Sequence, residues 1–199
     1  EVKSQLNASY ATILNLYEKH KDELYKIYPL SLHSFQSKKY QQKDALKLIE
    51  AKVNLLKENG YIAGNALTPP LYAGAGLTQK GQFAKSVYGY ELILSELYAN
   101  NILEQLDEFG LGVLAASIVF EPRKNQNMLS LSKSSRRLRS ICEEIYGEIK
   151  RWESKYKIHP FSKSPYFHLS SCMEAWLRGT NFNKALRFTD TDEGEVVRY

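Results

Sequence analysis

Apolar residues recur along most of the chain at the spacing of one face of an α-helix. Pro29 and Gly60 follow two such stretches, and both residue types commonly end helices. A polar connector is expected at 31–43. The pattern therefore predicts a mainly α-helical bundle. Its helices are expected over residues 5–28, 44–59, 133–157, 167–178, 181–188 and from 191 onward, with three short helices within 79–120.

One stretch departs from the helical spacing. Short apolar segments at 60–62 and 77–78 flank a loop that is rich in proline and glycine. Turn residues between two short apolar segments are typical of a hairpin. Thr78 is suited to cap the helix that follows. We therefore expect one small, winged-helix-like β-hairpin near residues 60–78.

Two of the predicted helices have unusual faces. The helix at 133–157 carries its apolar residues on one narrow seam and most of its basic residues on its back. The helix at 108–120, capped by Asp107, is apolar almost all round, which predicts a position at the centre of the core. Gly110 and Gly112 would let neighbouring helices approach it closely. The seam consists of Leu138, Ile141, Cys142, Ile145, Ile149, Trp152 and Tyr156.

The positive charge of the chain is local. Its formal net charge is +5, yet residues 122–157 alone hold ten Lys and Arg against four Glu, a local charge of +6. A basic segment on a near-neutral body favours a polyanionic partner such as RNA. A solvated helix face explains the same pattern equally well.

The apolar segments and the two cysteines indicate where in the cell the protein is expected. No window of apolar residues is long enough to span a membrane, so no membrane partner is expected. Cys142 and Cys172 show no CxxC spacing, which fits a reducing, cytoplasmic setting. Because the chain begins at Glu1 and stops inside a predicted helix, we expect it to be a piece of a longer protein.

The sequence contains no pattern that predicts catalysis. Gly74, Gly76 and Lys80 do not make a phosphate loop, because the glycine–lysine order is wrong and no Ser or Thr follows. His168 and Cys172 stand four residues apart, as a metal site on a helix would require, but Cys142 and His159 are far from them in sequence. We therefore expect no catalytic residues, no metal site and no cofactor in this chain itself.

The segment from Ala175 to the end looks structural. Gly179 is expected to end a helix, and the aromatic rings of Trp176 and Phe182 to pack between consecutive helices. Thr189 or Asp190 is expected to cap a final helix that opens near Glu193, where acidic residues favour the positive end of the helix dipole.

Two arginines of this segment, Arg178 and Arg198, allow two interpretations. In the first, they are surface charges or form salt bridges with Asp190 or Glu193. In the second, they face a phosphate, and the sequence leaves both interpretations open.

Four blocks of residues, in order, resemble the DSHCT domain of superkiller-type (antiviral-type), exosome-associated RNA helicases of superfamily 2. They are LTQKGQFA at 77–84, which contains Lys80 and Gly81, then YELILSEL at 90–97, LAASIVFE at 114–121, and the segment 175–199. The last block is close to the family pattern AWxxGxxFxxIxxxTDxxEGxxIR, to which Trp176, Gly179, Phe182, Thr189, Asp190, Glu193 and Gly194 belong. Ala185 replaces a usual isoleucine, and residues 122–134 fit the pattern poorly.

The resemblance implies a domain that packs against two ATPase domains and closes a ring around the unwinding RNA strand. A helix starting near Glu193 would touch the RNA, and Arg198 matches the arginine of its first turns. Residues 60–199 would form a DSHCT-like helical domain truncated at its C-terminus. Residues 1–59 would form a helical lead-in, either the end of an inserted stalk or a linker returning to the helicase body.

We therefore expect a non-catalytic C-terminal domain of an ATP-dependent RNA helicase, with ATP and Mg²⁺ bound elsewhere in the parent chain. Its expected partners are single-stranded RNA, the ATPase domains and an exosome-like or nuclease partner. The candidate RNA-binding residues are Arg136, Arg137, Arg139, Arg178 and Arg198. The alternatives are a winged-helix regulator built on 44–88, whose helix 44–59 mixes acidic and basic residues, and a protein-interaction adaptor.

Overall fold

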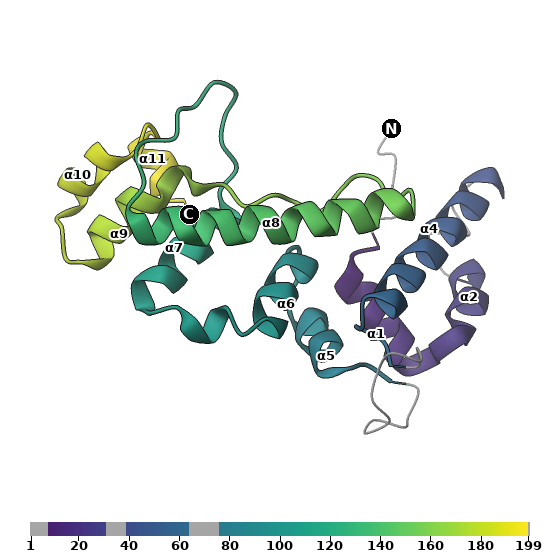
Figure 1. Ribbon diagram of the computed structural model, residues 1–199. Helices are drawn as coiled ribbons and strands as arrows, with labels where there is room; N and C mark the ends of the chain where they lie inside the picture. Colours follow the sequence, from purple (N-terminus) through teal and green to yellow (C-terminus); the bar gives the residue numbers. More distant parts are fainter. Residues whose placement is uncertain (1–7, 31–38, 64–75, 199) are drawn as a thin grey trace. The chain divides into compact units, whose positions relative to one another are not determined.

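The computed structural model describes residues 8–30, 39–63 and 76–198. The described residues are mainly helical, as predicted, and none of their helices is both long and apolar enough to cross a membrane (Figure 1). The chain divides into two compact units, which are described one at a time. Unit 1 contains residues 1–96 and 149–162, and unit 2 contains residues 97–148 and 163–199. The division at residue 59 expected from the resemblance stays a prediction.

Unit 1 begins with several short helical pieces instead of the single helix predicted over 5–28. Helix α1 (Tyr10–His20) starts at Ser9, whose hydroxyl accepts the Thr12 N–H at 3.1 Å. It ends at Lys21, which adopts a φ of 48°, a conformation that breaks a helix. A turn at Lys21–Glu23, helix α2 (Leu24–Ile27) and a turn at Tyr28–Leu30 follow. The apolar period therefore predicted the helical character but not the break.

Helix α4 (Lys39–Glu58) extends further toward the N-terminus than the predicted 44–59, so part of the expected connector at 31–43 is helical. Its end agrees with the prediction. Gly60 has a φ of +74°, and the Tyr61 N–H reaches back to the Leu56 carbonyl at 2.9 Å. This is the pattern of a helix end closed by glycine, which adopts a positive φ without steric cost.

The predicted hairpin is not confirmed. The described residues contain one isolated antiparallel bridge, between Ile62 and Leu77, and no strand. Two further backbone bonds run beside it, from the Ala63 N–H to the Gly76 carbonyl at 2.8 Å and from the Thr78 N–H to the Tyr61 carbonyl at 3.0 Å. The loop with its prolines and Gly74 lies outside the described residues.

The bridge leads directly into helix α5 (Gln79–Ser86). The Thr78 hydroxyl caps this helix by accepting the Gly81 N–H at 3.1 Å, as predicted. Helix α1 packs against both α4 and α5. The first part of helix α6 (Glu91–Ala99) and the last part of α8 (Lys133–Lys155) also belong to unit 1. The fully buried side chains of this unit include Ile13, Leu14, Leu55, Leu56, Tyr61, Ile62 and Ile149.

Unit 2 is organised around helix α7 (Glu108–Val119), which packs against helix α9 (Ser170–Leu177). Asp107 caps α7 as predicted, since its carboxylate accepts the Gly110 N–H at 2.8 Å. Gly112 allows the close approach of α9, because a Cβ there would lie 2.4 Å from Cδ1 of Leu177. Gly110 instead faces the side chain of Leu106, in the segment before its own helix.

The expectation that α7 is buried all round is wrong. Leu111 and Val119 are 44% and 39% exposed, whereas Val113, Leu114 and Ala116 are buried. In the described chain α7 therefore behaves as a one-sided helix with an apolar outer face. Apolar residues are common on protein surfaces, so a helix that is apolar almost all round need not be buried all round.

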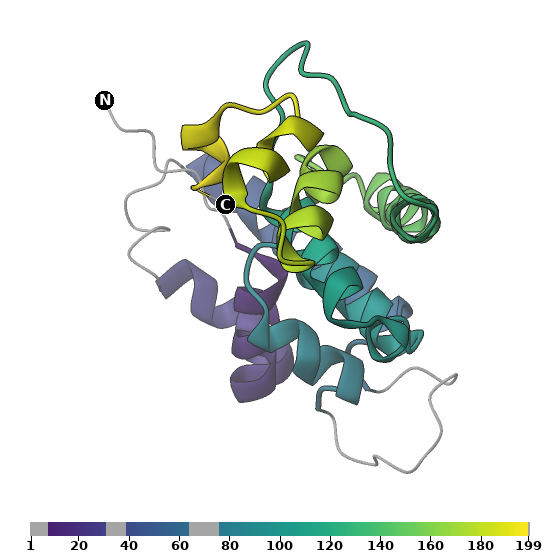
Figure 2. The ribbon, with the colours of Figure 1, turned by 90° about the vertical axis from the view of Figure 1, so that its left-hand side faces the viewer.

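The other helices of unit 2 are short. Besides the first part of α8, they are a turn at Leu103–Gln105, a turn at Phe167–Leu169, α10 (Phe182–Ala185), a turn at Leu186–Phe188 and α11 (Glu193–Val196). The segment between α7 and α8 forms a long arch, which is visible in both views (Figures 1 and 2). Ser132 caps α8 by accepting the Ser135 N–H at 3.1 Å. Leu138 and Cys142 of the predicted seam are buried in this unit.

Candidate functional site

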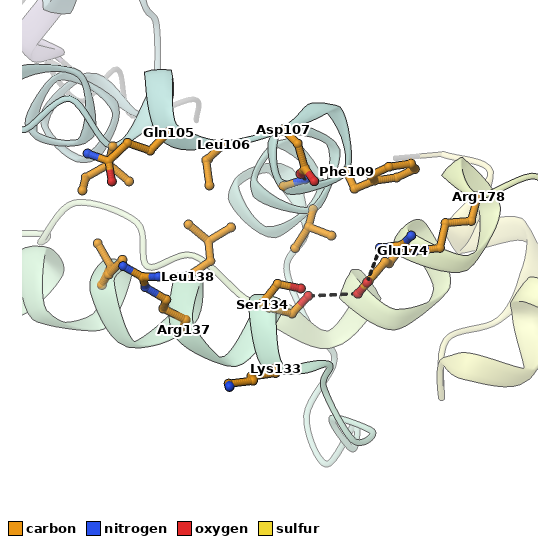
Figure 3. A pocket seen from close by; sticks show the side chains of 15 residues that line it. Gln105, Leu106, Asp107, Phe109, Lys133, Ser134, Arg137, Leu138, Glu174 and Arg178 are labelled. Atoms are coloured by element: carbon orange, nitrogen blue, oxygen red, sulfur yellow. Dashed lines mark hydrogen bonds and ion pairs between the residues drawn. The ribbon is translucent and has the colours of Figure 1, made fainter.

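A pocket of about 640 Å³ opens in unit 2 between the start of α7, the first turns of α8 and the side of α9 (Figure 3). The segment before α7 contributes one wall, and residues that lie three or four positions apart on α8 contribute the opposite wall. Such residues share one face of a helix, which is why the first turns of α8 present several side chains to the same space. The lining includes Leu106, Phe109, Lys133, Arg137, Glu174 and Arg178.

The floor of the pocket is aliphatic. Leu106 and Val113 come from the α7 side, and Leu138 and Ile141 come from α8. Val113 and Leu138 are buried, while Leu106 and Ile141 are half-buried. The same apolar seam that anchors α8 in unit 2 therefore continues into a space that no side chain of the described residues fills.

One end of the pocket is closed by an arginine that is already engaged. The Arg178 guanidinium donates to the Glu174 carboxylate at 3.2 Å and lies 4.4 Å from the centre of the Phe109 ring. The Ser135 hydroxyl donates to the other oxygen of Glu174 at 3.3 Å. Of the alternatives left open for Arg178, the salt bridge to Asp190 or Glu193 is not the one observed, since the carboxylate of Glu174, one helical turn away, is its partner.

Two further cations, Lys133 and Arg137, line the pocket from the first two turns of α8. Within the described residues neither makes an ion pair, and both are exposed. The first turn of α8 contains no acidic residue. Lys133 lies in the first turn and so faces the positive end of the helix dipole, which means that its charge does not stabilise α8.

The three other predicted RNA-binding arginines do not line this pocket. Arg136 is exposed and stands on a different face of α8 from Arg137. Arg139 is half-buried, donating to Glu143 at 2.7 Å and lying 3.5 Å from the Met128 sulfur. Arg198 is exposed, just after α11. The structure thus brings Arg137 and Arg178 to one pocket and leaves Arg136, Arg139 and Arg198 apart from it.

Lys80 and Gly81 lie in unit 1, where both have structural roles. The Lys80 ammonium pairs with Glu96, donates to the Asn59 carbonyl at 3.0 Å and lies 4.3 Å from the centre of the Tyr61 ring. A Cβ on Gly81 would lie 2.0 Å from the Tyr61 carbonyl oxygen. The Lys-Gly step of the first family block therefore fixes the start of α5 against the bridge.

Tyr61 completes this buried group. Its hydroxyl donates to Glu96 at 2.6 Å, and the Ser95 hydroxyl lies 3.1 Å away. Burial, with the negative charge of Glu96, raises the pKa of Tyr61 well above its ordinary value, so the phenol stays protonated and remains a donor.

A second buried carboxylate in unit 1 was not predicted. Glu153 is only 1% exposed and accepts three hydrogen bonds, from the Tyr10 hydroxyl at 2.9 Å, the Ser162 N–H at 2.9 Å and the Ser162 hydroxyl at 2.8 Å. Burial, followed by the charge of Glu153, raises the pKa of Tyr10. The signal in the sequence was its spacing, since Glu153 follows Ile149 by four residues and so lies on the apolar seam.

The two aromatic residues of the C-terminal block are more open than predicted. Gly179 ends α9 with a φ of +83°, as expected, but Trp176 is 53% exposed. The apolar stripe of α9 starts in the core at Leu169 and Cys172 and runs outward to Trp176. Trp176 and Phe182 there line a second, apolar pocket of about 490 Å³ with Met173, Val196 and Val197.

The predicted capping role of Thr189 and Asp190 is wrong. Helix α11 starts after Asp192, and no side chain caps it. Asp190 instead accepts hydrogen bonds from the N–H and the side-chain amide of Asn127, at 3.1 and 3.2 Å. The Thr189 hydroxyl lies 3.4 Å from the His168 carbonyl and 3.0 Å from the Thr191 hydroxyl.

The neighbouring residues strengthen this attachment of the arch to the C-terminal segment. Arg123 pairs with Asp192 at 2.9 Å and with Glu195 at 3.3 Å, and the Gln126 amide donates to Thr191 at 2.6 Å. The TDTDE sequence therefore holds the arch between α7 and α8. Glu193 keeps its predicted place in the first turn of α11, whereas nothing in the structure requires glycine at Gly194.

The residues with metal-ligating side chains remain apart. The described part of the chain contains no group of three or more His, Cys, Asp or Glu that could hold a metal ion. Cys142 and Cys172 are both buried thiols, and burial raises the pKa of Cys142 to about 12. At neutral pH this sulfur is a protonated, apolar part of the core.

The fold and the pocket define a helical domain that presents basic and apolar surfaces. A comparison with protein families gives the particular class: the DSHCT (NUC185) domain matches residues 74–199. The chain belongs to the DSHCT domain family, whose known setting is the superkiller-type helicases. No curated protein sequence matched in the corresponding comparison.

Proposed function

We propose that this chain is the non-catalytic C-terminal helical domain of an ATP-dependent superfamily 2 RNA helicase. In this proposal it supports the ATPase domains of the parent protein and guides single-stranded RNA during RNA processing or decay. The observation that carries the proposal is the family match over residues 74–199. ATP, Mg²⁺, an exosome-like or nuclease partner and a cytoplasmic location belong to the same proposal.

The exposed arginines are the proposed RNA contacts. Arg136 and Arg198 are exposed and lie outside the pocket, so a phosphate backbone can reach them. Arg137 and Arg178 are exposed at the pocket. Arg139 is the weakest candidate, because Glu143 already pairs with its guanidinium. Contacts of this kind bind phosphates without reading sequence. They weaken as the salt concentration rises, because the counterions that binding releases then enter a more concentrated solution and their release is less favourable.

The experiment is a titration of labelled single-stranded RNA of mixed sequence at two salt concentrations. We expect weak, salt-sensitive binding, and we expect the double variant Arg136→Gln with Arg198→Gln to weaken it. The slope of log K against log salt should fall in magnitude by about 1.4, since each lost phosphate contact on a single strand removes about 0.7. Arg187→Gln is the matched control, because Arg187 is exposed in the same unit but is not a proposed contact.

Other outcomes would replace the proposal. Unchanged affinity and slope in the double variant would remove these two arginines from the RNA path. Tight, sequence-specific binding of duplex DNA would favour the winged-helix regulator. Absence of binding to any nucleic acid at low salt would favour the protein-interaction adaptor.

A further inference from the structure

We propose that the pocket between α7, α8 and α9 binds a short acidic peptide segment of a protein partner, with aliphatic side chains in its floor and carboxylates on Lys133 and Arg137. This proposal goes beyond RNA guidance and does not depend on it. It rests on the chemistry of the floor, on the charges at the rim and on the size of the space.

The floor selects aliphatic groups. Leu106, Val113, Leu138 and Ile141 present methyl and methylene groups to the pocket. Unpaired nucleobases bind mainly by stacking on exposed aromatic rings. Phe109 is the aromatic residue among those lining this pocket, and the Arg178 guanidinium already covers a face of its ring. The floor is therefore suited to a leucine or isoleucine side chain rather than to a base.

The rim selects carboxylates. Both acidic side chains of the pocket are engaged within the protein, Asp107 with the Gly110 N–H and Glu174 with Arg178 and Ser135. Lys133 and Arg137 make no ion pair within the described residues. An incoming acidic residue would meet two cations that form no ion pair within the described residues, so the charges are complementary. Figure 3 shows Arg137 beside Leu138, at the opposite end of the pocket from the Arg178–Glu174 pair.

The size fits a peptide segment. The pocket holds about 640 Å³, which is within the range of sites that bind small ligands and short anchors. A few buried aliphatic anchors with a charged rim are a common arrangement at protein interfaces. The exposed apolar residue Leu111 lies on the same helix, α7, just beyond the pocket-lining Gly110.

The test uses three labelled peptides and fluorescence anisotropy with the whole chain. One peptide alternates leucine with aspartate, the second replaces leucine by serine, and the third replaces aspartate by lysine. We expect the acidic aliphatic peptide to bind about tenfold more tightly than the serine peptide, since leucine burial is lost there. The lysine peptide should bind more weakly still, because it brings cations to Lys133 and Arg137.

Two adjacent arginines provide a matched pair of variants. Arg137→Glu should weaken the acidic aliphatic peptide about fivefold or more, whereas Arg136→Glu makes the same charge change on another face of α8 and should leave it unchanged. Both residues are exposed, so neither variant threatens the fold. Ile141→Gln tests the floor and should also weaken binding, with thermal melting used to confirm that the variant is folded.

Three results would overturn the proposal. The first is equal binding of the three peptides. The second is an equal loss in Arg136→Glu and Arg137→Glu, which would mean non-specific charge attraction. The third is that single-stranded RNA displaces the peptide and itself loses affinity in Arg137→Glu but not in Arg136→Glu, which would assign the pocket to RNA.

Discussion

The first and last family blocks of the chain behave differently, although both carry the resemblance. In unit 1, Lys80 and Gly81 sit in a packed site in which Glu96, Asn59 and the Tyr61 carbonyl surround them. In unit 2, Trp176 is more than half exposed on the edge of an apolar pocket. Membership of a family pattern therefore does not distinguish a residue that holds the fold from one that presents a surface. Substitutions at the two blocks should separate these roles.

The largest effect is expected at Gly81. A Cβ there would lie 2.0 Å from a backbone oxygen, so Gly81→Ala must displace the bridge between residues 62 and 77 or the start of α5. We expect a loss of about 3 kcal/mol or more in the free energy of unfolding, measured in urea.

Gly194→Ala is the control, since nothing lies within 4 Å of that position. It should change stability by less than about 1 kcal/mol. If Gly81→Ala were as harmless as the control, the close packing of the Lys-Gly step would be refuted.

The next effect concerns Glu153, which shares the packed character of unit 1. Glu153→Gln places an amide where three donors converge, so the Tyr10 hydroxyl or a Ser162 donor loses its acceptor. We expect a loss of about 2 kcal/mol in the free energy of unfolding, because the groups are buried.

The exposed Glu144 provides the comparison, and Glu144→Gln should stay within about 0.5 kcal/mol of the parent chain. Equal effects of the two changes would show that the buried network contributes nothing to stability.

Trp176→Ala should lower the free energy of unfolding only a little, although the tryptophan side chain is large. A buried tryptophan loses about 3–5 kcal/mol on truncation to alanine, but the ring of Trp176 is 53% exposed. We expect a loss of less than about 2 kcal/mol in the free energy of unfolding, measured in urea. Phe167→Ala, at a buried position of the same unit, should cost about 3 kcal/mol or more. A larger loss at Trp176 than at Phe167 would restore the core assignment.

The sequence predicted features that depend on local physics. The caps at Thr78 and Asp107, the glycine ends at Gly60 and Gly179, and the span of α8 all follow from neighbouring residues, and all are present. The features it missed depend on residues far away in the chain. Asp190 binds Asn127 instead of capping α11, and the cations of α8 meet the start of α7 in a pocket. No local pattern encodes such pairings.

The break at Lys21 is a different kind of miss. The apolar period continues across residues 10–28, and only the positive φ of one lysine interrupts the helix. Nothing in the residue type signals that conformation, because lysine favours helices. The candidate site was also predicted only in part. The arginines were visible in the sequence, whereas the pocket that Arg137 and Arg178 both line depends on tertiary packing.

The smallest effect is expected at His168 and concerns pH. Burial lowers the pKa of His168, with a further lowering from the charge of Arg139, and a hydrogen bond to the Gln126 backbone opposes the shift. Because the folded-state pKa lies below the unfolded value, the unfolded chain binds more protons in mildly acidic solution. The stability of unit 2 should therefore fall as pH decreases through about 6.5, the ordinary histidine value, and level off below the folded-state pKa.

Urea unfolding at a series of pH values tests this dependence. His168→Gln removes the titrating group from beside the Phe120 ring, 5.8 Å away, and should flatten the curve between neutral and mildly acidic pH. An identical pH dependence in the parent chain and in His168→Gln would mean that the arch held by Gln126 and Asp190 tolerates a charged imidazole.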